Sequence, residues 1–461
     1  MLAGSLAPLN STMIVVALPA ILADLGAPLA WGSWIIVSYL VAMAAVQPLG
    51  GKLGDRYGDR RLLLVGLVCF LVASLVAALA PNVIVLILAR TAQALSGAIA
   101  LPNGSALVRR VVPFEGQGRA FGIVGAGIGV AAALGPPLGG VLTEAFGWRM
   151  TFMANIAVIV PALLFAYRLP HGATQDTAGS PTQDATAVQP PFDIGGAALL
   201  IVTLVALALT MTIWRVPEVP VLAMPVLALV ALAGGALLPR HLKRTPAPVL
   251  DLGLFRRSGF LAAGMTILLS NMVMYTIFIA IPLFMGQVLG WEPSQVGLML
   301  AAMSVPMLLL GPVGGTASDR LGKRAPAVIG CVCAAVGVGS LALLTEHWSG
   351  VRLGLSLAAV GFGIGLSSAP VHTAALQAAP REQAGQAAGL FSTMRYLGSV
   401  IGSAGLAAIL GSSANVGSFR TTFTLLLLAA AAAVFSASRL PGKGMDATEH
   451  AEVTRLPRRP L

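Results

Sequence analysis

The sequence contains little charge. Only 10% of its 461 residues are charged, whereas 57% are hydrophobic. A soluble globular domain carries about 25% charged residues, so this composition excludes a soluble protein and predicts an integral membrane protein. The net charge of +11 does not indicate nucleic-acid binding, because the basic residues lie in short segments between apolar runs. We expect no nucleic-acid partner.

Residues that carry chemistry are also scarce. The three cysteines, Cys69, Cys331 and Cys333, all lie within apolar stretches, which argues against a disulfide framework. The sequence shows no cluster of metal ligands, no nucleophile beside a base and no phosphate-binding loop after a strand. These absences argue against a membrane enzyme or receptor. We expect no metal and no cofactor.

What the sequence does contain is a series of continuous apolar runs of about 20 residues, the length of a helix that crosses a bilayer. The alternating segments of about 10 residues that are typical of an outer-membrane barrel are missing. We therefore predict an all-α integral membrane protein with fourteen transmembrane helices. The expected spans are 2–23, 32–53, 61–80, 83–107, 119–143, 150–168, 194–214, 220–239, 259–286, 294–317, 325–345, 352–377, 385–411 and 419–439.

The distribution of basic residues predicts the orientation. With the N-terminus inside, 22 of the 28 Lys and Arg residues fall on the inner side and four on the outer side. Because cytoplasmic loops are enriched in Lys and Arg, we expect both termini in the cytoplasm. The polar segment 169–193 then becomes a cytoplasmic linker, and 440–461 becomes a cytoplasmic tail.

One short segment occurs twice. Residues 51–61 read GKLGDRYGDRR and residues 315–324 read GTASDRLGKR, 264 positions later. Pro102 and Pro370 stand in corresponding helices at nearly the same offset. Such duplication predicts two related six-helix bundles, as in transporters built from repeats. The expected divisions are an N-terminal bundle at 1–168, two inserted helices and a cytoplasmic connector at 194–258, and a C-terminal bundle at 259–439.

Several segments together resemble the major facilitator superfamily. The first copy resembles its signature Gly-x-Leu-Ala-Asp-Arg-x-Gly-Arg-Lys, and Arg90–Gln93 resembles its fourth-helix motif. Residues 9–19 and 248–256 resemble motifs of the fourteen-helix drug:proton antiporter branch. The resemblance implies a monomeric multidrug-efflux transporter that exports small amphipathic compounds through the cytoplasmic membrane in exchange for protons. An exporter of lipids or metabolites with the same fold, and with different or no proton coupling, is the alternative.

The resemblance also assigns mechanical roles. The duplicated segments are expected to form gating loops that latch the cytoplasmic side and contact membrane lipids, through Gly51, Asp55, Arg56, Gly58, Arg60, Arg61, Gly315, Asp319, Arg320, Gly322, Lys323 and Arg324. The fifth helix carries the pattern that marks antiporters, formed by Gly127, Gly135, Pro136, Gly139 and Gly140. A proline kinks a helix and glycines let a neighbouring helix approach closely, so this helix is expected to act as a hinge and seal.

Proton coupling needs a titratable or charged group within the membrane. Arg90 and Arg395 fall inside apolar spans, where a cation costs several kcal/mol unless it is paired or hydrated. The resemblance implies that Arg90 takes part in coupling. The antiporter branch usually carries an aspartate where this chain has Asn10, and the sequence predicts no carboxylate near the membrane midplane. The coupling candidates are Arg90, His372, Arg395, Asp24 and Glu144.

Polar residues inside the spans are candidates to line a central cavity for the substrate. They are Asn10, Gln47, Gln93, Asn103, Asn155, Asn271 and Tyr275. Each of them is also explained by a hydrogen bond between helices, which is a common role of such side chains in membranes. The buried arginines favour a neutral, amphipathic or anionic substrate over a cationic one.

Overall fold

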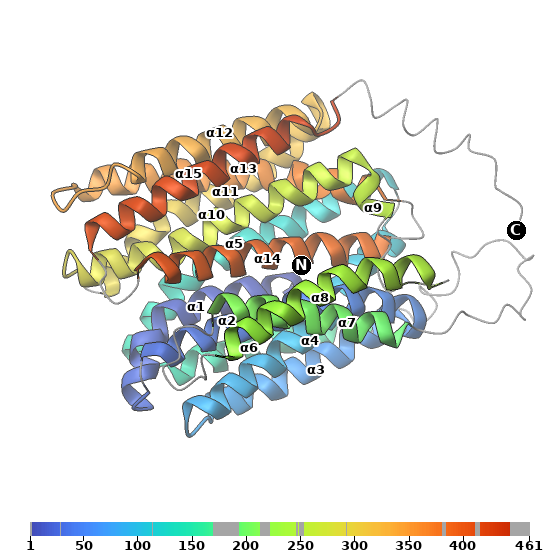
Figure 1. The fold of residues 1–461 in the computed structure, drawn as a ribbon, viewed down its shortest axis with the longest axis horizontal. Coiled ribbons are helices and arrows are strands. Elements are labelled where there is room, and N and C mark those ends of the chain that lie inside the picture. Colours follow the sequence, from blue (N-terminus) through green and yellow to red (C-terminus); the bar gives the residue numbers. More distant parts are fainter. Residues whose placement is uncertain are drawn as a thin grey trace, which may run out of the picture.

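The computed structural model describes residues 2–27, 29–112, 114–168, 193–212, 222–245, 248, 253–291, 293–379, 384–410 and 415–442. Over these ranges the regular structure is all helical (Figure 1). The helices are α1 Leu2–Asp24, α2 Leu29–Tyr57, α3 Asp59–Ala78, α4 Val83–Val111, α5 Phe114–Phe146, α6 Arg149–Arg168, α7 Ile194–Thr212, α8 Ala223–Arg244, α9 Gly253–Arg256, α10 Ser258–Gln287, α11 Pro293–Leu321, α12 Arg324–Leu341, α13 Gly350–Gln377, α14 Ala384–Leu410 and α15 Val416–Ser438.

The helices are long and apolar enough for a multi-pass membrane protein. Among the described residues, eleven helices have the length and composition to cross a membrane. The number of fourteen spans stays a prediction. Each expected span of the sequence coincides with one long helix, although several helices extend further than predicted.

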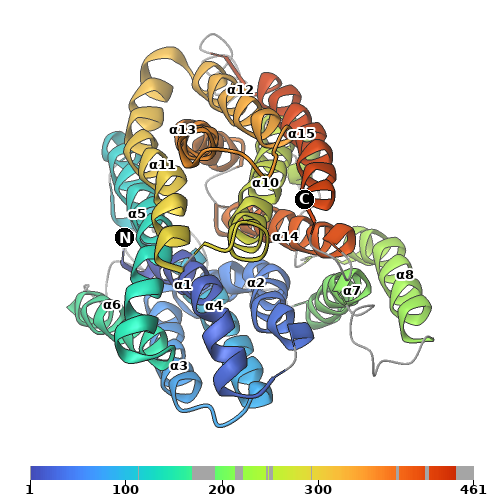
Figure 2. The same ribbon diagram turned by 90° about the vertical axis from the view of Figure 1, so that its left-hand side faces the viewer.

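The helices form two groups with the same internal packing. In the first group α1 packs on α5, α2 on α4, and α3 on α4 and α6; in the second, α10 packs on α14, α11 on α13, and α12 on α13 and α15. Adding nine to the number of each helix in the first group gives the packed pairs of the second group. The main contacts between the groups, α2 with α14 and α5 with α11, are interchanged by the same operation. The two groups are therefore related by a pseudo-two-fold axis that runs between them (Figure 2).

Two further helices lie outside this symmetry. Helices α7 and α8 pack on each other, and α7 also contacts α2 and α14 at the edge of the junction between the groups (Figure 2). Asp193 accepts a hydrogen bond from the backbone of Gly196 at 2.7 Å and lies 2.8 Å from His241 of α8. These contacts hold the start of α7 against the end of α8.

The duplicated segments are not loops, which corrects the sequence prediction. Residues 51–57 continue α2, and Gly58 alone separates it from α3. In the second copy α11 continues to Leu321, and Gly322 and Lys323 precede α12. Gly58 and Gly322 have φ of 91° and 80°, a backbone conformation that glycine adopts without steric cost. The repeated glycine therefore makes a tight helix-to-helix turn in each half.

The antiporter-type glycines bring two helix backbones into contact. A Cβ added to Gly139 of α5 would lie 2.6 Å from the carbonyl oxygen of Met13 in α1. Gly135 lies one turn earlier against Thr12 of the same helix. Pro136 is accommodated within α5, which runs without a break from Phe114 to Phe146. A neighbouring helix thus approaches α5 closely at these glycines, as expected, and that helix is α1.

The second half repeats this crossing without repeating the motif. In α14, Gly398 and Gly402 pack on Leu268 and Met272 of α10. A Cβ on Gly402 would lie 2.6 Å from the carbonyl oxygen of Met272, which matches the distance for Gly139. No Gly-Pro pair marks these glycines, so the sequence alone does not distinguish them from other glycines in apolar helices.

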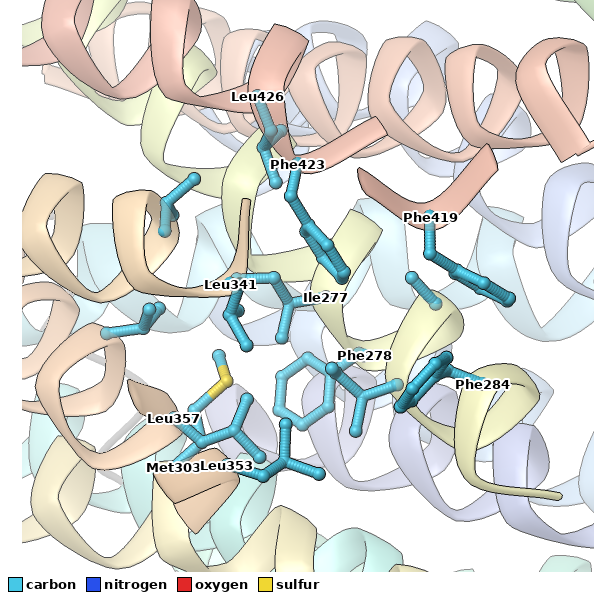
Figure 3. Packing of buried hydrophobic residues seen from close by; sticks show 14 of the residues in the cluster. Ile277, Phe278, Phe284, Met303, Leu341, Leu353, Leu357, Phe419, Phe423 and Leu426 are labelled. Atoms are coloured by element: carbon cyan, nitrogen blue, oxygen red, sulfur yellow. The ribbon is translucent and has the colours of Figure 1, made fainter. Parts of the chain in front are cut away.

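The second bundle has its large apolar core at the end away from the Gly322 turn. Phe284 of α10 and Phe419 of α15 meet edge to face with ring centroids 5.3 Å apart (Figure 3). Around them pack buried side chains from the near ends of α11, α12 and α13, including Met303, Leu341 and Leu353 (Figure 3). This cluster joins α10, α11, α12, α13 and α15 at that end of the second bundle.

Candidate functional site

A cavity of about 270 Å³ lies between the two bundles. Its lining comes from α1, α2, α4 and α5 of the first group and from α10, α11, α13 and α14 of the second. The lining residues lie in the part of each helix nearest the Gly58 and Gly322 turns, for example Pro102, Gly311 and Thr373. Both halves therefore contribute to one site, which is displaced toward the end that carries the glycine turns.

The cavity wall is mainly apolar with a few polar side chains. Met274, Met307, Leu308 and Ile364 are part of the apolar wall. Such a wall with a small number of placed polar groups is typical of small-molecule sites, whose volumes are about 300–1,000 Å³. The volume of this cavity lies just below that range.

Five of the coupling and substrate-cavity candidates line this cavity: Gln47, Asn271, Tyr275, His372 and Arg395. The hydroxyl oxygen of Tyr275 lies 3.2 Å from Oγ of Ser11, so this pair joins α10 to α1. Ser11 and Tyr275 are 264 positions apart, the same offset as the two glycine turns. They therefore meet where the pseudo-symmetry predicts equivalent residues to approach each other.

The other four polar candidates lie inside the first bundle and are not among the cavity-lining residues. Asn10, Gln93, Asn103 and Asn155 are at most 1% exposed. Asn10 donates to Oε1 of Gln93 at 3.3 Å, and Asn155 donates to Oδ1 of Asn10 at 3.3 Å. Asn103 donates to the carbonyl of Gly50 at 2.9 Å. Because a buried amide is costly without partners, these side chains hydrogen-bond between helices, which is the alternative that the sequence left open.

Arg90 belongs to the same buried cluster. Its side chain is fully buried, and Nη1 donates to Oε1 of Gln93 at 3.0 Å. The guanidinium carbon lies 4.2 Å from the ring centroid of Tyr39, close enough for a cation–π interaction. An amide oxygen and an aromatic face thus stabilise this cation, and Asn10 occupies the cluster with an amide rather than a carboxylate.

Arg395 has a different environment. Its side chain lines the cavity, and the guanidinium carbon lies 5.6 Å from the ring centroid of Phe391. The ring of His372 also packs on Phe391, with centroids 5.2 Å apart. The ion pairs of the described residues are Asp24–Arg149, Asp59–Arg110 and Asp193–His241, so Arg395 belongs to none of them.

The two outer coupling candidates lie away from the cavity. Asp24 ends α1 and accepts hydrogen bonds from Arg149 at 2.6 Å and from Trp148 at 2.9 Å. Glu144 is exposed near the end of α5. Both stand at the end opposite the glycine turns and are absent from the cavity lining. The structure therefore separates them from Arg395 and His372, the two coupling candidates that line the cavity.

The duplicated segments are placed at the mouth of the cavity and around it. Gly315 and Asp319 line it, which the sequence did not predict. Arg60 donates to the carbonyl oxygens of Ala166 and Tyr167 at the end of α6, at 3.2 Å and 2.6 Å. Of the other basic side chains of the two copies, Arg56, Arg61, Arg320 and Arg324 are exposed and Lys323 is buried. Lys52 is half-buried and donates to the carbonyl oxygen of Pro248 at 2.6 Å. The side chain of Asp55 lies outside the described residues.

One charged residue of this region was missed. Asp59, the first residue of α3, is fully buried, and its carboxylate lies 2.9 Å from Nε of Arg110 near the end of α4. An acidic residue directly after the Gly58 turn is a helix N-terminal signal, because the helix dipole favours an anion there. That signal was available in the sequence but does not identify Arg110 as the partner.

Two six-helix groups that share a central cavity define a carrier-type membrane protein. The chain belongs to the Major Facilitator Superfamily, whose family model matches residues 1–403. It is similar to the uncharacterized MFS-type transporter YvkA of Bacillus subtilis, with 33% identity over 94% of this chain and 93% of the relative. It is also similar to the multidrug resistance protein Stp of Mycobacterium tuberculosis, with 30% identity over 88% and 73%. A probable actinorhodin transporter of Streptomyces coelicolor is 32% identical over 88% and 71%.

Proposed function

We propose that this transporter exports small amphipathic compounds across the cytoplasmic membrane by alternating access, in exchange for protons. The observation that carries this proposal is the cavity lined by both bundles and displaced toward one end. On its other side a buried cluster that includes Ile36, Leu40 and Val400 joins α2 to α14. Rocking of the bundles about their pseudo-two-fold axis would transfer the opening from one end to the other. The monomer is sufficient, because one chain supplies both halves.

The charge distribution supports a cavity that lies on the cytoplasmic side. The cavity is nearest the glycine turns, and that end carries most of the basic residues, which favours a cytoplasmic position. Names of the relatives support a small organic substrate, since two of those compared are called a multidrug resistance protein and a probable actinorhodin transporter. The apolar wall of the cavity fits such compounds.

Coupling to protons is proposed for Arg90 and His372. His372 lines the cavity and is the kind of side chain that titrates near neutral pH when unperturbed. Arg90 lies in the buried cluster with Asn10, where the antiporter branch usually has a carboxylate. The missing carboxylate is the observation that favours the second candidate function, export of a lipid or metabolite with other or no proton coupling.

The test is transport in proteoliposomes. Purified protein is reconstituted, and uptake of one cationic, one neutral and one anionic dye is followed with and without an imposed pH gradient. We expect gradient-driven uptake of at least one dye by the wild type, and its loss in Arg90→Ala and His372→Ala. Arg352→Ala is the matched control, because Arg352 is exposed and stacks on Trp348 at the far end.

Each outcome separates the candidates. Dye transport that does not respond to the gradient contradicts proton antiport and favours the second candidate function. Gradient-driven transport that survives in both variants would remove Arg90 and His372 from the coupling mechanism. Absence of transport for every dye and for extracted lipids would contradict the export function itself.

A further inference from the structure

Arg395 places a positive charge deep in the cavity. It stands eleven residues after the first residue of α14, Ala384. At 1.5 Å per residue the guanidinium-bearing residue lies about 16 Å along the helix, close to the middle of a hydrocarbon core of about 30 Å. The charge is therefore held at the depth where a carrier of this architecture binds its substrate.

Among the described residues the guanidinium of Arg395 has no carboxylate and no hydrogen-bond acceptor as a partner, only the ring of Phe391 with its centroid at 5.6 Å. It takes part in none of their ion pairs, and its Nε is buried with no hydrogen-bond partner. The Nε of Arg90 is also buried without a hydrogen-bond partner, but Nη1 of Arg90 donates to the amide oxygen of Gln93 at 3.0 Å and its guanidinium carbon lies 4.2 Å from the Tyr39 ring centroid. Of the two intramembrane arginines, one is stabilised by its own bundle and the other faces the cavity.

The acidic residue of the cavity wall does not neutralise Arg395. Asp319 is the one carboxylate among the described lining residues, and it is exposed two residues before the end of α11. Asn271, which also lines the cavity, donates its amide to the carbonyl of Ile267 in its own helix at 3.1 Å. The charge on Arg395 is left for water or for a ligand to satisfy.

We propose that Arg395 binds an anionic group of the transported compound, so that the substrate is an organic acid with an apolar body. This inference rests on the proposed transport function and names its substrate class. A guanidinium binds a carboxylate through two parallel hydrogen bonds. Ser392 also lines the cavity and stands three residues before Arg395, on the same helix face. The apolar body then lies against Met274, Met307 and Ile364.

The charge also explains how binding favours closure. In the open cavity, water hydrates the guanidinium, but closure without a ligand would bury it unpaired, which costs several kcal/mol. An anionic substrate removes that cost because the pair, rather than the lone cation, is enclosed. Closure is thus favoured when the cavity is loaded.

The test compares acids with their amides, which have nearly the same shape but no charge. Dissociation constants are measured by equilibrium dialysis on the purified full-length protein in detergent at pH 7. The pairs are benzoic acid and benzamide, 2-naphthoic acid and 2-naphthamide, and 1-pyrenebutyric acid and its amide. We expect the wild type to bind the acid of at least one pair tenfold more tightly, which corresponds to about 1.4 kcal/mol.

The variants assign this preference to Arg395. Arg395→Gln should bind the acid and the amide equally, and Arg395→Lys should keep an intermediate preference, because lysine retains the charge but not the planar fork. The control Arg352→Gln should behave as the wild type. If Arg395→Gln does not fold, Arg395→Lys still tests the inference. It should prefer the acid over the amide less strongly than the wild type does, while its affinity for the amide stays unchanged.

Two results would overturn the inference: equal binding of acid and amide by the wild type in every pair, or an acid preference that persists in the Arg395 variants. Neither result depends on the transport assay. A wild type that transports dyes without any acid preference contradicts the substrate class alone. An acid preference in a protein that transports nothing contradicts the export function alone.

Discussion

Replacing Gly139 with alanine should destabilise the crossing of α5 and α1. The added Cβ would lie 2.6 Å from the carbonyl oxygen of Met13 and 2.9 Å from its Cα, whereas ordinary contacts begin at 3.4 Å. The obstacle is helix backbone, which cannot rotate away as a side chain can. Overpacking of this kind costs about 1–3 kcal/mol, and we expect the upper part of that range. Alanine has a higher helix propensity than glycine, which stabilises the helix by about 1 kcal/mol. The net loss in the free energy of unfolding is therefore about 2 kcal/mol.

The neighbouring Gly140 supplies a matched control. A Cβ there meets Val16 at 3.7 Å, an ordinary contact, so Gly140→Ala should be neutral or stabilising by up to about 1 kcal/mol. The second half offers the same comparison, because a Cβ on Gly402 would lie 2.6 Å from the Met272 carbonyl oxygen and one on Gly405 would meet nothing within 4 Å. We expect Gly402→Ala to behave as Gly139→Ala does, and Gly405→Ala as Gly140→Ala does.

The assay is the fraction of purified protein that remains monodisperse after heating, measured by size-exclusion chromatography over a range of temperatures. Gly139→Ala and Gly402→Ala should lose the folded peak at lower temperature than their matched controls. If Gly139→Ala survives heating as well as Gly140→Ala, the backbone contact between α1 and α5 is not a determinant of stability. If only the first half responds, the two crossings are not equivalent.

Three further substitutions probe other contacts by the same heating assay. Asp59→Asn should destabilise by about 1–3 kcal/mol, less than the loss of a fully buried pair because the side chain of Arg110 is 33% exposed. Asp24→Asn should have little effect, since this carboxylate and its arginine partner are both about half exposed and such surface pairs contribute little to stability; an effect as large as that of Asp59→Asn would contradict this. Tyr275→Phe removes the hydroxyl contact with Ser11 between the halves and should cost about 0.5–1.5 kcal/mol; a more stable variant would show that the contact is not favourable.

Much of the fold was predictable because membrane spans are constrained locally. In hydrocarbon each backbone group must be satisfied within its own helix, so length and hydropathy identify the helices without knowledge of their neighbours. The duplicated segment at 51–61 and 315–324 predicted two related halves, and the packing of α1–α6 repeats in α10–α15. Gly139 was also predictable, because a proline-linked glycine pattern has a direct steric meaning.

The candidate site was predictable only in part. Asn10 and Asn271 have the same side chain in similar apolar surroundings, yet one lies in the buried cluster of the first bundle and the other lines the cavity. Periodicity gives the face on which a residue lies relative to its own helix, but not which helix covers that face. Gly402 was missed for the same reason, since its role is defined by Met272 of α10.

The sequence by itself determined the membrane class, the approximate helices, the repeat of two halves and the intramembrane position of Arg90 and Arg395. These features depend on composition, length and order along one chain. Only the tertiary structure decided that Arg90 contacts Gln93 and Tyr39 within its own bundle while Arg395 faces the cavity. The physical reason is that the free energy of a buried charge depends on the atoms around it, and those atoms come from helices distant in the sequence.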